Sequence, residues 1–321
     1  MITLVLGLPG SGKSSIAKNI AGARLNRDEM GGSLDDLAKE AEQMILEGKD
    51  LVLDNTYVTK ESRKSIIEVA KRNNVQIVAK IMNTTSDDCQ INVCLRALEK
   101  YGEIPQYGKK YNDPGMFPAA AIFKAKNTFE LPTVEEGFDS VEIIEFKRVW
   151  GKEYVNKAVF LDIDDTLRTS TGKQFWAESA EDVKVLPGRT EQMNQWKRDG
   201  YMLFGVSNQS PIAKGLSETK VIEAFNETKK QLGVEFPIAY CKHAAHPLAC
   251  YCRKPGPGMA IEQIFKHKLY VKKCFMVGDS TSDITMAKRL GMAGFHPDKI
   301  FTQSLSVPVE QKTKSENKLI I

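Results

Sequence analysis

The sequence predicts an α/β protein with two tandem domains, and three observations support this fold class. The chain has 321 residues, which is more than one hydrophobic core normally organises. Short apolar runs alternate with amphipathic stretches, a pattern typical of parallel strands joined by right-handed helical crossovers. The alternation occurs twice, once in each half of the chain. We expect domains at residues 1–148 and 155–305, followed by a polar, lysine-rich tail at 306–321.

The composition is that of an ordinary globular protein, with 42% hydrophobic and 27% charged residues. It excludes a disordered chain, and the absence of a long repeat excludes a solenoid. No run approaches the ~18–20 apolar residues of a membrane span, and the N-terminus lacks signal-peptide features, so we expect a cytoplasmic protein without a membrane partner. The formal net charge of +4 neither requires nor excludes phosphate-rich partners.

Apolar runs define the strands expected in each half, and amphipathic stretches define the helices between them. The first half has runs at 2–6, 51–53 and 76–81, with amphipathic stretches at 34–47 and 60–73. The second half has runs at 158–161, 202–206, 238–240 and 274–277. The seam between the two domains is expected within residues 147–156, a polar stretch too short for a long flexible tether.

The first predicted strand leads directly into Gly7-Leu8-Pro9-Gly10-Ser11-Gly12-Lys13-Ser14, which matches the phosphate-loop pattern at every fixed position. Glycines allow consecutive backbone N–H groups to curl around a phosphate, and the next helix directs its positive end at the same anion. A lysine in this place reaches the β- and γ-phosphates, and the following hydroxyl ligates Mg²⁺. We therefore expect ATP and Mg²⁺ at Gly10, Ser11, Gly12, Lys13, Ser14 and Ser15, with Ser14 on the metal.

Two acids follow predicted strands that should end beside the phosphates. Asp28, in Asn26-Arg27-Asp28, is placed to accept the proton of an attacking hydroxyl, the base role in kinase chemistry. The alternative is that Asp28 caps the helix expected next. Asp54, at the end of Leu51-Val52-Leu53-Asp54, is expected to hold the metal through water or to position the acceptor. Its alternative is a turn residue at the strand end.

A pair of cations lies further along the first half. Arg96 and Lys100 are four residues apart on a predicted helix, so they share one face. They suit a lid that closes over the transferred phosphoryl group and neutralises its charge. A solvated basic face is the alternative.

The second half begins with an apolar strand that ends in an Asp-x-Asp-x-Thr pattern. This pattern, at Asp162, Asp164 and Thr166, resembles the first motif of the haloacid-dehalogenase phosphohydrolases. Residues two apart on an extended segment face the same side, so the two acids approach one substrate together. Asp162 is expected to attack phosphorus and form an aspartyl-phosphate. Asp164 is expected to protonate the leaving alcohol and then to activate water.

The remaining motifs of that superfamily follow in order. Ser207 ends a strand in a hydroxyl that can hydrogen-bond a phosphate, and Asn208 follows it. Arg253 and Lys254 supply cations near the phosphoryl group, Lys254 as a catalytic residue. Asp279 is expected to bind Mg²⁺ together with Asp162 and Asp164. The gaps between these motifs are too short for a sizeable cap domain, so an open site is expected, which suits a bulky or polymeric substrate end.

A cysteine-rich loop stands directly ahead of Arg253. Cys241-Lys242-His243 and Cys250-Tyr251-Cys252 form two ligand pairs that can make a tetrahedral, structural zinc site. The loop is similar to that of the capless phosphatases acting on histidinol phosphate and heptose bisphosphate. That resemblance implies Cys241, His243, Cys250 and Cys252 as ligands, with His246 as a competing imidazole; buried free cysteines are the alternative.

A kinase and a phosphatase in one chain are useful together if one end of a polymer gains phosphate while another loses it. The whole chain resembles the bacteriophage bifunctional polynucleotide kinase-phosphatases through Gly7 to Ser15, Asn26-Arg27-Asp28 and Asp162-x-Asp164. The resemblance implies Asp28 as the base, Arg96 and Lys100 as the lid, and RNA or DNA ends as partners, processed before a ligase acts. Two positions depart from the phage pattern: Gly31 stands where it has an arginine, and Lys100 replaces its second lid arginine.

The leading hypothesis is therefore a polynucleotide 5′-hydroxyl kinase joined to a 3′-phosphatase. A kinase-phosphatase for sugar phosphates or other small metabolites is the alternative, and a nucleotide-regulated RNA-binding protein is a third reading that the intact acid motifs oppose. The pattern does not decide RNA against DNA, the processing of a 2′,3′-cyclic phosphate, or the oligomeric state. Nor does it identify aromatic side chains that stack on bases.

Overall fold

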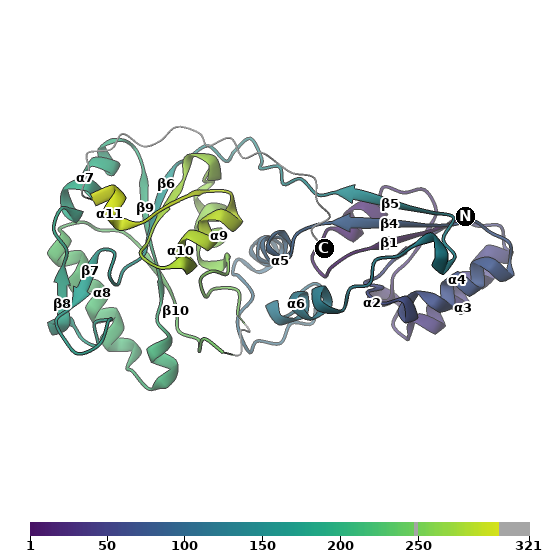
Figure 1. Ribbon diagram of the computed structural model, residues 1–321, viewed down its shortest axis with the longest axis horizontal. Coiled ribbons are helices and arrows are strands. Elements are labelled where there is room, and N and C mark those ends of the chain that lie inside the picture. The colour runs from purple at the N-terminus through teal and green to yellow at the C-terminus, as the bar shows by residue number, and fades with distance from the viewer. Residues whose placement is uncertain (247–249, 302–321) are drawn as a thin grey trace. The chain divides into compact units, whose positions relative to one another are not determined.

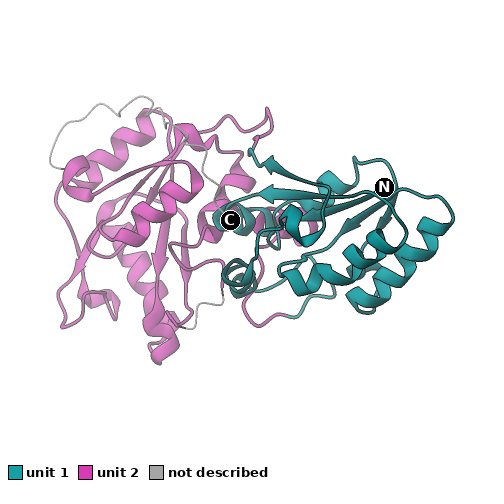
Figure 2. Cartoon of the chain, turned by 45° about the vertical axis from the view of Figure 1, so that its right-hand side comes forward, with its two compact units in different colours: residues 1–93, 110–148, 316–321 teal, residues 94–109, 149–315 magenta. Residues whose placement is uncertain are grey.

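A computed structural model describes residues 1–246 and 250–301, and these divide into two compact units (Figure 2). Unit 1 comprises residues 1–93 and 110–148, and unit 2 comprises residues 94–109 together with the described residues from 149 onward. The tail expected at 306–321 lies outside the described residues. No helix within the described ranges is long and apolar enough to cross a membrane.

The strands of unit 1 form one parallel sheet in the order β2-β3-β1-β4-β5. Figure 1 shows β1, β4 and β5 side by side in this sheet. They are β1 (Ile2–Leu6), β2 (Ala23–Leu25), β3 (Leu51–Asp54), β4 (Ile77–Asn83) and β5 (Ser140–Glu145). The helical segments are α1 (Lys13–Ala17), α2 (Arg27–Met30), α3 (Leu34–Leu46), α4 (Lys60–Arg72), α5 (Ser86–Tyr101), α6 (Ala119–Thr128) and the 3₁₀ turn η1 (Val134–Glu136). The α5 helix begins in unit 1 and continues into unit 2 after Val93.

Side chains of β1 alternate between two buried faces, which explains its uninterrupted apolar sequence. Leu4 and Leu6 pack into the core formed with α3 and α4, whereas Val5 packs with Ala17 of α1 on the opposite face. The sheet is therefore covered on both sides, as expected of parallel strands joined by helices.

Unit 2 contains a second parallel sheet, in the order β10-β9-β6-β11-β12, and a small antiparallel pair of strands. The strands are β6 (Ala158–Leu161), β7 (Arg168–Ser170), β8 (Val183–Val185), β9 (Met202–Asn208), β10 (Ile238–Cys241), β11 (Phe275–Val277) and β12 (Ala293–Phe295). The helices are α7 (Arg189–Arg198), α8 (Glu218–Leu232), α9 (Gly258–His267), α10 (Thr281–Leu290) and α11 (Pro297–Phe301). Short 3₁₀ turns are η2 (Ala180–Asp182), η3 (Ser210–Lys214) and η4 (Val271–Lys273).

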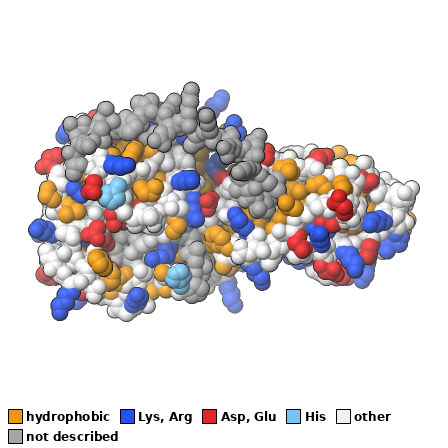
Figure 3. Space-filling view, viewed as in Figure 1, with side chains coloured by type: hydrophobic (Ala, Val, Ile, Leu, Met, Phe, Trp, Pro, Cys, Tyr) orange, Lys and Arg blue, Asp and Glu red, His pale blue; other side chains and the backbone are white. Residues whose placement is uncertain are grey.

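Alternate residues of β6 again serve two faces. Val159 and Leu161 join a core that includes Trp196 of α7 and Phe225 of α8, while Phe160 stacks on Phe204 with ring centroids 5.7 Å apart. The predicted fold class, α/β with parallel sheets and two tandem domains, is confirmed. On the molecular face in Figure 3, basic and acidic side chains are interspersed, in keeping with the small net charge.

Candidate functional sites in the two domains

The phosphate loop joins β1 to α1, as the sequence predicts. Gly10 and Gly12 have φ values of 80° and 94°, a backbone region that side chains disfavour. A Cβ at Gly10 would lie 2.8 Å from the carbonyl oxygen of Cys89, so only glycine fits there. Lys13 Nζ donates to two carbonyl oxygens at the start of the loop, at 2.9 and 3.1 Å. The lysine is thus folded over the loop that is expected to hold the phosphates.

Two side chains outside the loop fix its backbone. Asn92 Nδ2 donates to the carbonyl oxygen of Gly10 at 2.8 Å, and Thr84 Oγ1 donates to that of Ser11 at 2.9 Å. Ser14 and Ser15 are exposed at the start of α1. The loop conformation therefore depends on contacts from β4 and α5 that the motif alone does not contain.

Asp28 lies in the first turn of α2, where its side chain is 55% exposed. The N-cap of α2 is Asn26, whose side chain accepts from the Asp28 backbone at 2.8 Å. The next helix, α3, is capped by Ser33. Asp28 therefore caps neither helix, and its carboxylate stays available to solvent. Gly31, with a φ of 77°, ends α2 in a conformation that would strain the arginine of the phage pattern.

Asp54 ends β3 and is 1% exposed. Its Oδ2 accepts from Arg24 Nη2 at 2.8 Å, and Asn26 Nδ2 donates to its backbone oxygen at 2.7 Å. The sequence analysis missed Arg24, because a lone arginine on a three-residue strand carries no motif. The pairing ties the ends of β2 and β3 together, and it places Asp54 beside the turn that leads to Asp28.

Arg96 and Lys100 lie one turn apart on α5, and both are exposed. Their shared face, which the spacing predicts, is present in the structure. Both belong to the part of α5 that is grouped with unit 2. Their role as a lid stays a prediction.

In unit 2, a buried lysine links the first and last acid motifs of the predicted phosphatase. Lys254 Nζ lies 2.5 Å from Asp162 Oδ1 and 2.7 Å from Asp283 Oδ1, and it donates to the Val206 carbonyl at 2.7 Å. Burial raises the pKa of the Asp162 carboxyl, and the Lys254 ammonium opposes that rise. Burial opposes the charge of Lys254 as well, but its two carboxylate partners outweigh it and raise its pKa. The lysine is thus held as a cation against the expected nucleophile.

Asp164 is oriented by two side chains that the sequence analysis did not single out. Arg168 Nε donates to its Oδ1 at 2.9 Å, and Gln209 Nε2 donates to its Oδ2 at 2.8 Å. Arg168 is fully buried and anchored to α8, whereas Asp164 is 20% exposed. Nothing in the local sequence distinguishes Arg168 from an ordinary surface arginine, so only the packing identifies it.

The three residues predicted to bind the phosphatase substrate, Ser207, Asn208 and Arg253, differ in burial and in hydrogen bonding. Ser207 is buried, and its Oγ accepts from Gln209. Asn208 bonds both the backbone N–H and the carbonyl of Lys254, at 2.9 and 3.0 Å, so its amide mainly holds the lysine in place. Arg253 is half-buried and is absent from the residues that line the catalytic pocket. Substrate contacts by these residues stay predictions.

Three carboxylates gather where β6 and β11 end. Oxygen atoms of Asp162, Asp279 and Asp283 all lie within 4.8 Å of one another, an oxygen-only donor set that suits Mg²⁺. A Cβ at Gly278 would lie 2.4 Å from Asp283 Cγ, so the close approach of this acid requires glycine. The carboxylate of Asp164 lies outside this set. The cavity over these acids measures about 270 Å³. It is lined by Asp162, Asp164, Asp165, Phe175, Trp176, Ser207, Asn208, Lys254, Asp279, Ser280 and Ser282.

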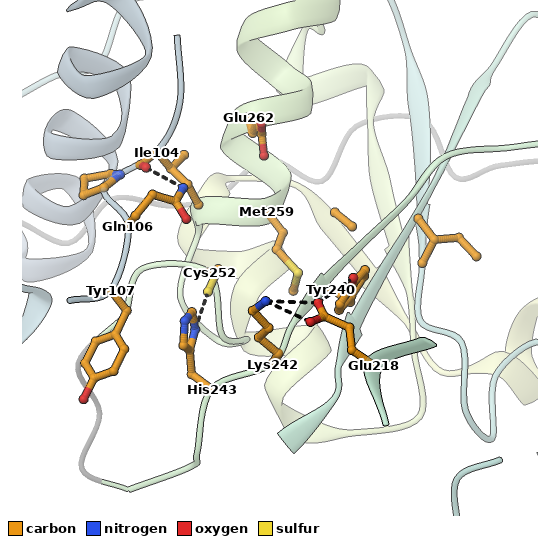
Figure 4. Close-up of a pocket in the computed structure, with 13 residues that line it drawn as sticks. Ile104, Gln106, Tyr107, Glu218, Tyr240, Lys242, His243, Cys252, Met259 and Glu262 are labelled. Carbon is orange, nitrogen blue, oxygen red and sulfur yellow. Dashed lines mark hydrogen bonds and ion pairs between the residues drawn. The ribbon is translucent and has the colours of Figure 1, made fainter. Parts of the chain in front are cut away.

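The predicted cysteine and histidine ligands form one cluster. Cys241 Sγ lies 3.8 Å from Cys250 Sγ and 3.4 Å from His243 Nδ1, which in turn lies 3.2 Å from Cys252 Sγ. Four-coordinate zinc with Zn–S bonds of about 2.3 Å places its ligand atoms at such separations. The cluster includes His243 and not the exposed His246. Figure 4 shows the His243 ring between Tyr107 and Cys252, and the Tyr107 ring meets it edge-on with centroids 5.1 Å apart.

Comparison with known families agrees with both halves of this description. Residues 2–132 match the AAA domain family, and residues 157–311 match the polynucleotide kinase 3 phosphatase family. The second domain belongs to the polynucleotide kinase 3 phosphatase family. The two domain matches together make the chain an end-healing enzyme, with a kinase in the first domain and a 3′-phosphatase in the second, as the sequence predicts.

Relatives of the phosphatase domain include enzymes with a different substrate. The D-glycero-beta-D-manno-heptose-1,7-bisphosphate 7-phosphatase of Helicobacter pylori is 33% identical over 135 residues, which cover 40% of this chain and 75% of that protein. A solved heptose bisphosphate phosphatase from B. bronchiseptica is 22% identical, with a TM-score of 0.41 over 52% of this chain and 94% of that one. A chain of the Pnkp1/Rnl/Hen1 RNA repair complex is 18% identical, with a TM-score of 0.34 over 92% of this chain and 95% of that one.

Proposed function

We propose that the phosphatase domain removes a 3′-phosphate in two steps. In the first, an Asp162 carboxylate oxygen attacks phosphorus and the bond between phosphorus and the 3′-oxygen breaks. Asp164 donates its proton to that oxygen, which leaves as a 3′-hydroxyl. In the second step Asp164 takes a proton from water as the water oxygen attacks phosphorus; the bond between phosphorus and the Asp162 oxygen breaks, which releases inorganic phosphate and frees the Asp162 carboxylate. The observation that carries this assignment is the contact between Lys254 and Asp162 beside the oriented carboxylate of Asp164.

The surrounding charges suit these steps. Lys254 neutralises part of the negative charge that accumulates when a carboxylate approaches a phosphate dianion. Arg168 and Gln209 aim Asp164 without occupying the pocket. Asp162, Asp279 and Asp283 are the residues that would hold Mg²⁺. When bound, Mg²⁺ supplies additional electrostatic stabilisation of the phosphoryl oxygens.

For the kinase domain, we propose that Lys13 and the backbone of the loop bind the β- and γ-phosphates of ATP, with Ser14 toward Mg²⁺. The exposed Asp28 accepts the proton of the 5′-hydroxyl as that oxygen attacks the γ-phosphorus, and ADP leaves. Asp54 supports this site indirectly, because Arg24 and Asn26 already engage it. Arg96 and Lys100 complete the site as lid cations.

We propose Zn²⁺ as the ion held by Cys241, His243, Cys250 and Cys252. The set of three sulfurs and one imidazole nitrogen is a closed, soft donor set, so the role is structural. The site fixes the loop that leads directly into Arg253 and Lys254. None of the six cysteines forms a disulfide, which fits the reducing cytoplasm expected from the sequence.

The products of the two reactions, a 5′-phosphate and a 3′-hydroxyl, are the ends that a ligase joins, so we propose that a ligase acts next. Activity on sugar phosphates is a second candidate, favoured by the 33% identity with the heptose bisphosphate phosphatase. One experiment separates the two. RNA and DNA oligonucleotides with 5′-hydroxyl and 3′-phosphate ends are incubated with labelled ATP and Mg²⁺, in parallel with heptose bisphosphate. Label at the 5′ end and phosphate released from the 3′ end support the proposal; turnover of the sugar phosphate alone contradicts it.

A further inference from the structure

Two adjacent aromatic side chains line the phosphatase pocket that contains Asp162 and Asp164. Phe175 is 80% exposed although it borders this pocket, and Trp176 beside it is half-buried. The Trp176 Nε1–H is buried and has no hydrogen-bond acceptor among the described residues. An exposed phenylalanine ring and an unpaired indole donor do not stabilise the folded protein. A ligand that contacts both would explain their placement beside the reaction site.

The segment that carries these aromatics is fixed at both ends. It runs from β7 to β8, which pair as antiparallel strands, and the Thr171 N–H donates to the Asp182 carbonyl at 2.9 Å. Asp182 Oδ2 also accepts from the backbone of Ser179 at 3.2 Å. The tip residues are therefore held against the pocket by the hairpin beneath them, and their position does not depend on a separate cap domain.

We infer that Phe175 and Trp176 form a stacking platform for the nucleobase of the 3′-terminal nucleotide, an assignment that rests on the proposed 3′-phosphatase function. The reacting phosphate must lie at Asp162, and the 3′-oxygen that leaves must lie within reach of Asp164. The sugar and base attached to that oxygen then extend from the pocket floor toward its rim. Apart from these two aromatics, every residue lining the pocket is polar or charged.

The two aromatic rings favour a nucleobase over a free sugar as the ligand. Aromatic rings stack on any nucleobase, because every base offers a π-face, and such stacking holds single strands without reading their sequence. A 3′-phosphatase has to accept all four bases, so a platform that is indifferent to sequence suits the reaction. A free sugar phosphate has no such face to offer.

The test compares the Phe175→Ala, Phe175→Tyr and Trp176→Phe variants with a Tyr270→Ala control, whose side chain is 37% exposed and does not line the pocket. Each protein, as the full chain with Mg²⁺, is given three substrates: a 3′-phosphorylated oligonucleotide, the same oligonucleotide with an abasic terminal nucleotide, and glycerol phosphate. Phe175→Ala is expected to lower kcat/KM about 5- to 100-fold on the first substrate through KM, and to leave the other two unchanged. Phe175→Tyr and Trp176→Phe keep an aromatic ring and are expected to retain most of the activity.

Each result decides the matter. An equal loss on the abasic and the complete oligonucleotide, or no loss on either, overturns the inference while leaving the 3′-phosphatase function intact. If the unmodified enzyme releases phosphate from neither oligonucleotide, the proposed function is wrong, and so is the inference of a stacking platform that rests on it. A loss in Tyr270→Ala equal to that in Phe175→Ala would also overturn the inference, because it would assign the effect to general damage.

Discussion

Replacement of Arg168 by methionine tests whether a buried cation orients the acid–base residue Asp164. The arginine side chain is fully buried, and its Nε donates to Asp164 Oδ1 at 2.9 Å. Its Nη1 donates to the Ala224 carbonyl and to Thr228 Oγ1, both at 2.8 Å. Methionine keeps much of the apolar stem but removes the charge and all of these bonds.

The expected loss of stability follows from what remains after the substitution. Breaking a buried ion pair costs about 3–5 kcal/mol when the surviving charge is left dry. Asp164 is 20% exposed and keeps its bond from Gln209, while Thr228 Oγ1 still donates to the Ala224 carbonyl. Because water and these hydrogen bonds partly satisfy the groups that Arg168 leaves behind, we expect the free energy of unfolding to fall by about 2–3 kcal/mol. For a domain of this size that lowers Tm by about 4–12 °C.

The expected loss of activity is larger than stability alone explains. A well-placed general acid contributes about 100- to 10,000-fold to a rate, and Arg168→Met leaves Asp164 present but held by one bond instead of two. We therefore expect kcat for 3′-phosphate removal to fall about 10- to 100-fold, with KM little changed.

The assay measures phosphate release from a 3′-phosphorylated oligonucleotide well below the melting temperature, with thermal unfolding followed separately. Kinase activity of the same preparation reports whether the rest of the chain is intact. Arg198→Met is the matched control, because Arg198 is exposed on α7 and contacts only Gln195 among the bonds found for it; we expect a change within about 0.5 kcal/mol. An unchanged kcat in Arg168→Met despite reduced stability would refute the positioning role and leave Arg168 a purely structural residue.

Four other substitutions and one elemental analysis test the remaining assignments. Lys13→Ala should abolish kinase activity and spare the phosphatase, whereas Asp162→Asn should do the reverse; loss of both activities in either variant would contradict separate sites. Gly278→Ala should cost about 1–3 kcal/mol and lower phosphatase activity, because the added Cβ would lie 2.4 Å from Asp283 Cγ; circular dichroism and phosphate release measure this, and wild-type behaviour would refute the close-packing argument. Elemental analysis should find about one zinc per chain, and Cys250→Ser should reduce both that content and Tm; unchelated protein without zinc would contradict the ligand assignment.

The strands that lead into the predicted catalytic residues could be predicted because they are continuous apolar runs, which is typical of strands buried on both faces. β6 and β9 are apolar runs that lead into polar residues, and they lie side by side in the sheet of unit 2. β5 was missed because Ser140–Glu145 lies at the edge of the sheet, where half of its side chains are exposed and the sequence alternates little. The hairpin of β7 and β8 was missed because three-residue strands are too short to show a period.

Side chains that act on the catalytic residues from neighbouring elements could not be predicted in the same way. Arg168 reaches Asp164 because β7 turns back beside β6, and Gln209 does so because it follows β9. Asn208 lines the pocket, as a substrate-binding residue would, and its amide also bonds the backbone of Lys254, a contact that the sequence does not reveal. Sequence spacing identifies which residues stand at a strand end; which of them face the ligand depends on three-dimensional packing.

The family assignment and the 33% identity with a heptose bisphosphate phosphatase point to different substrates, and the structure shows why both similarities can hold. The steps that we propose for Asp162, Asp164 and Lys254 are ones that any phosphate monoester requires, so residues at the strand ends carry little information about the alcohol that leaves. We expect that information where the alcohol is held, and within residues 171–182 it is Phe175 and Trp176 that line the pocket. A phenylalanine that is 80% exposed beside this pocket has no use in phosphoryl transfer itself. Its side chain is therefore the feature whose removal should separate a nucleotide substrate from a sugar phosphate, while the chemistry at Asp162 stays the same.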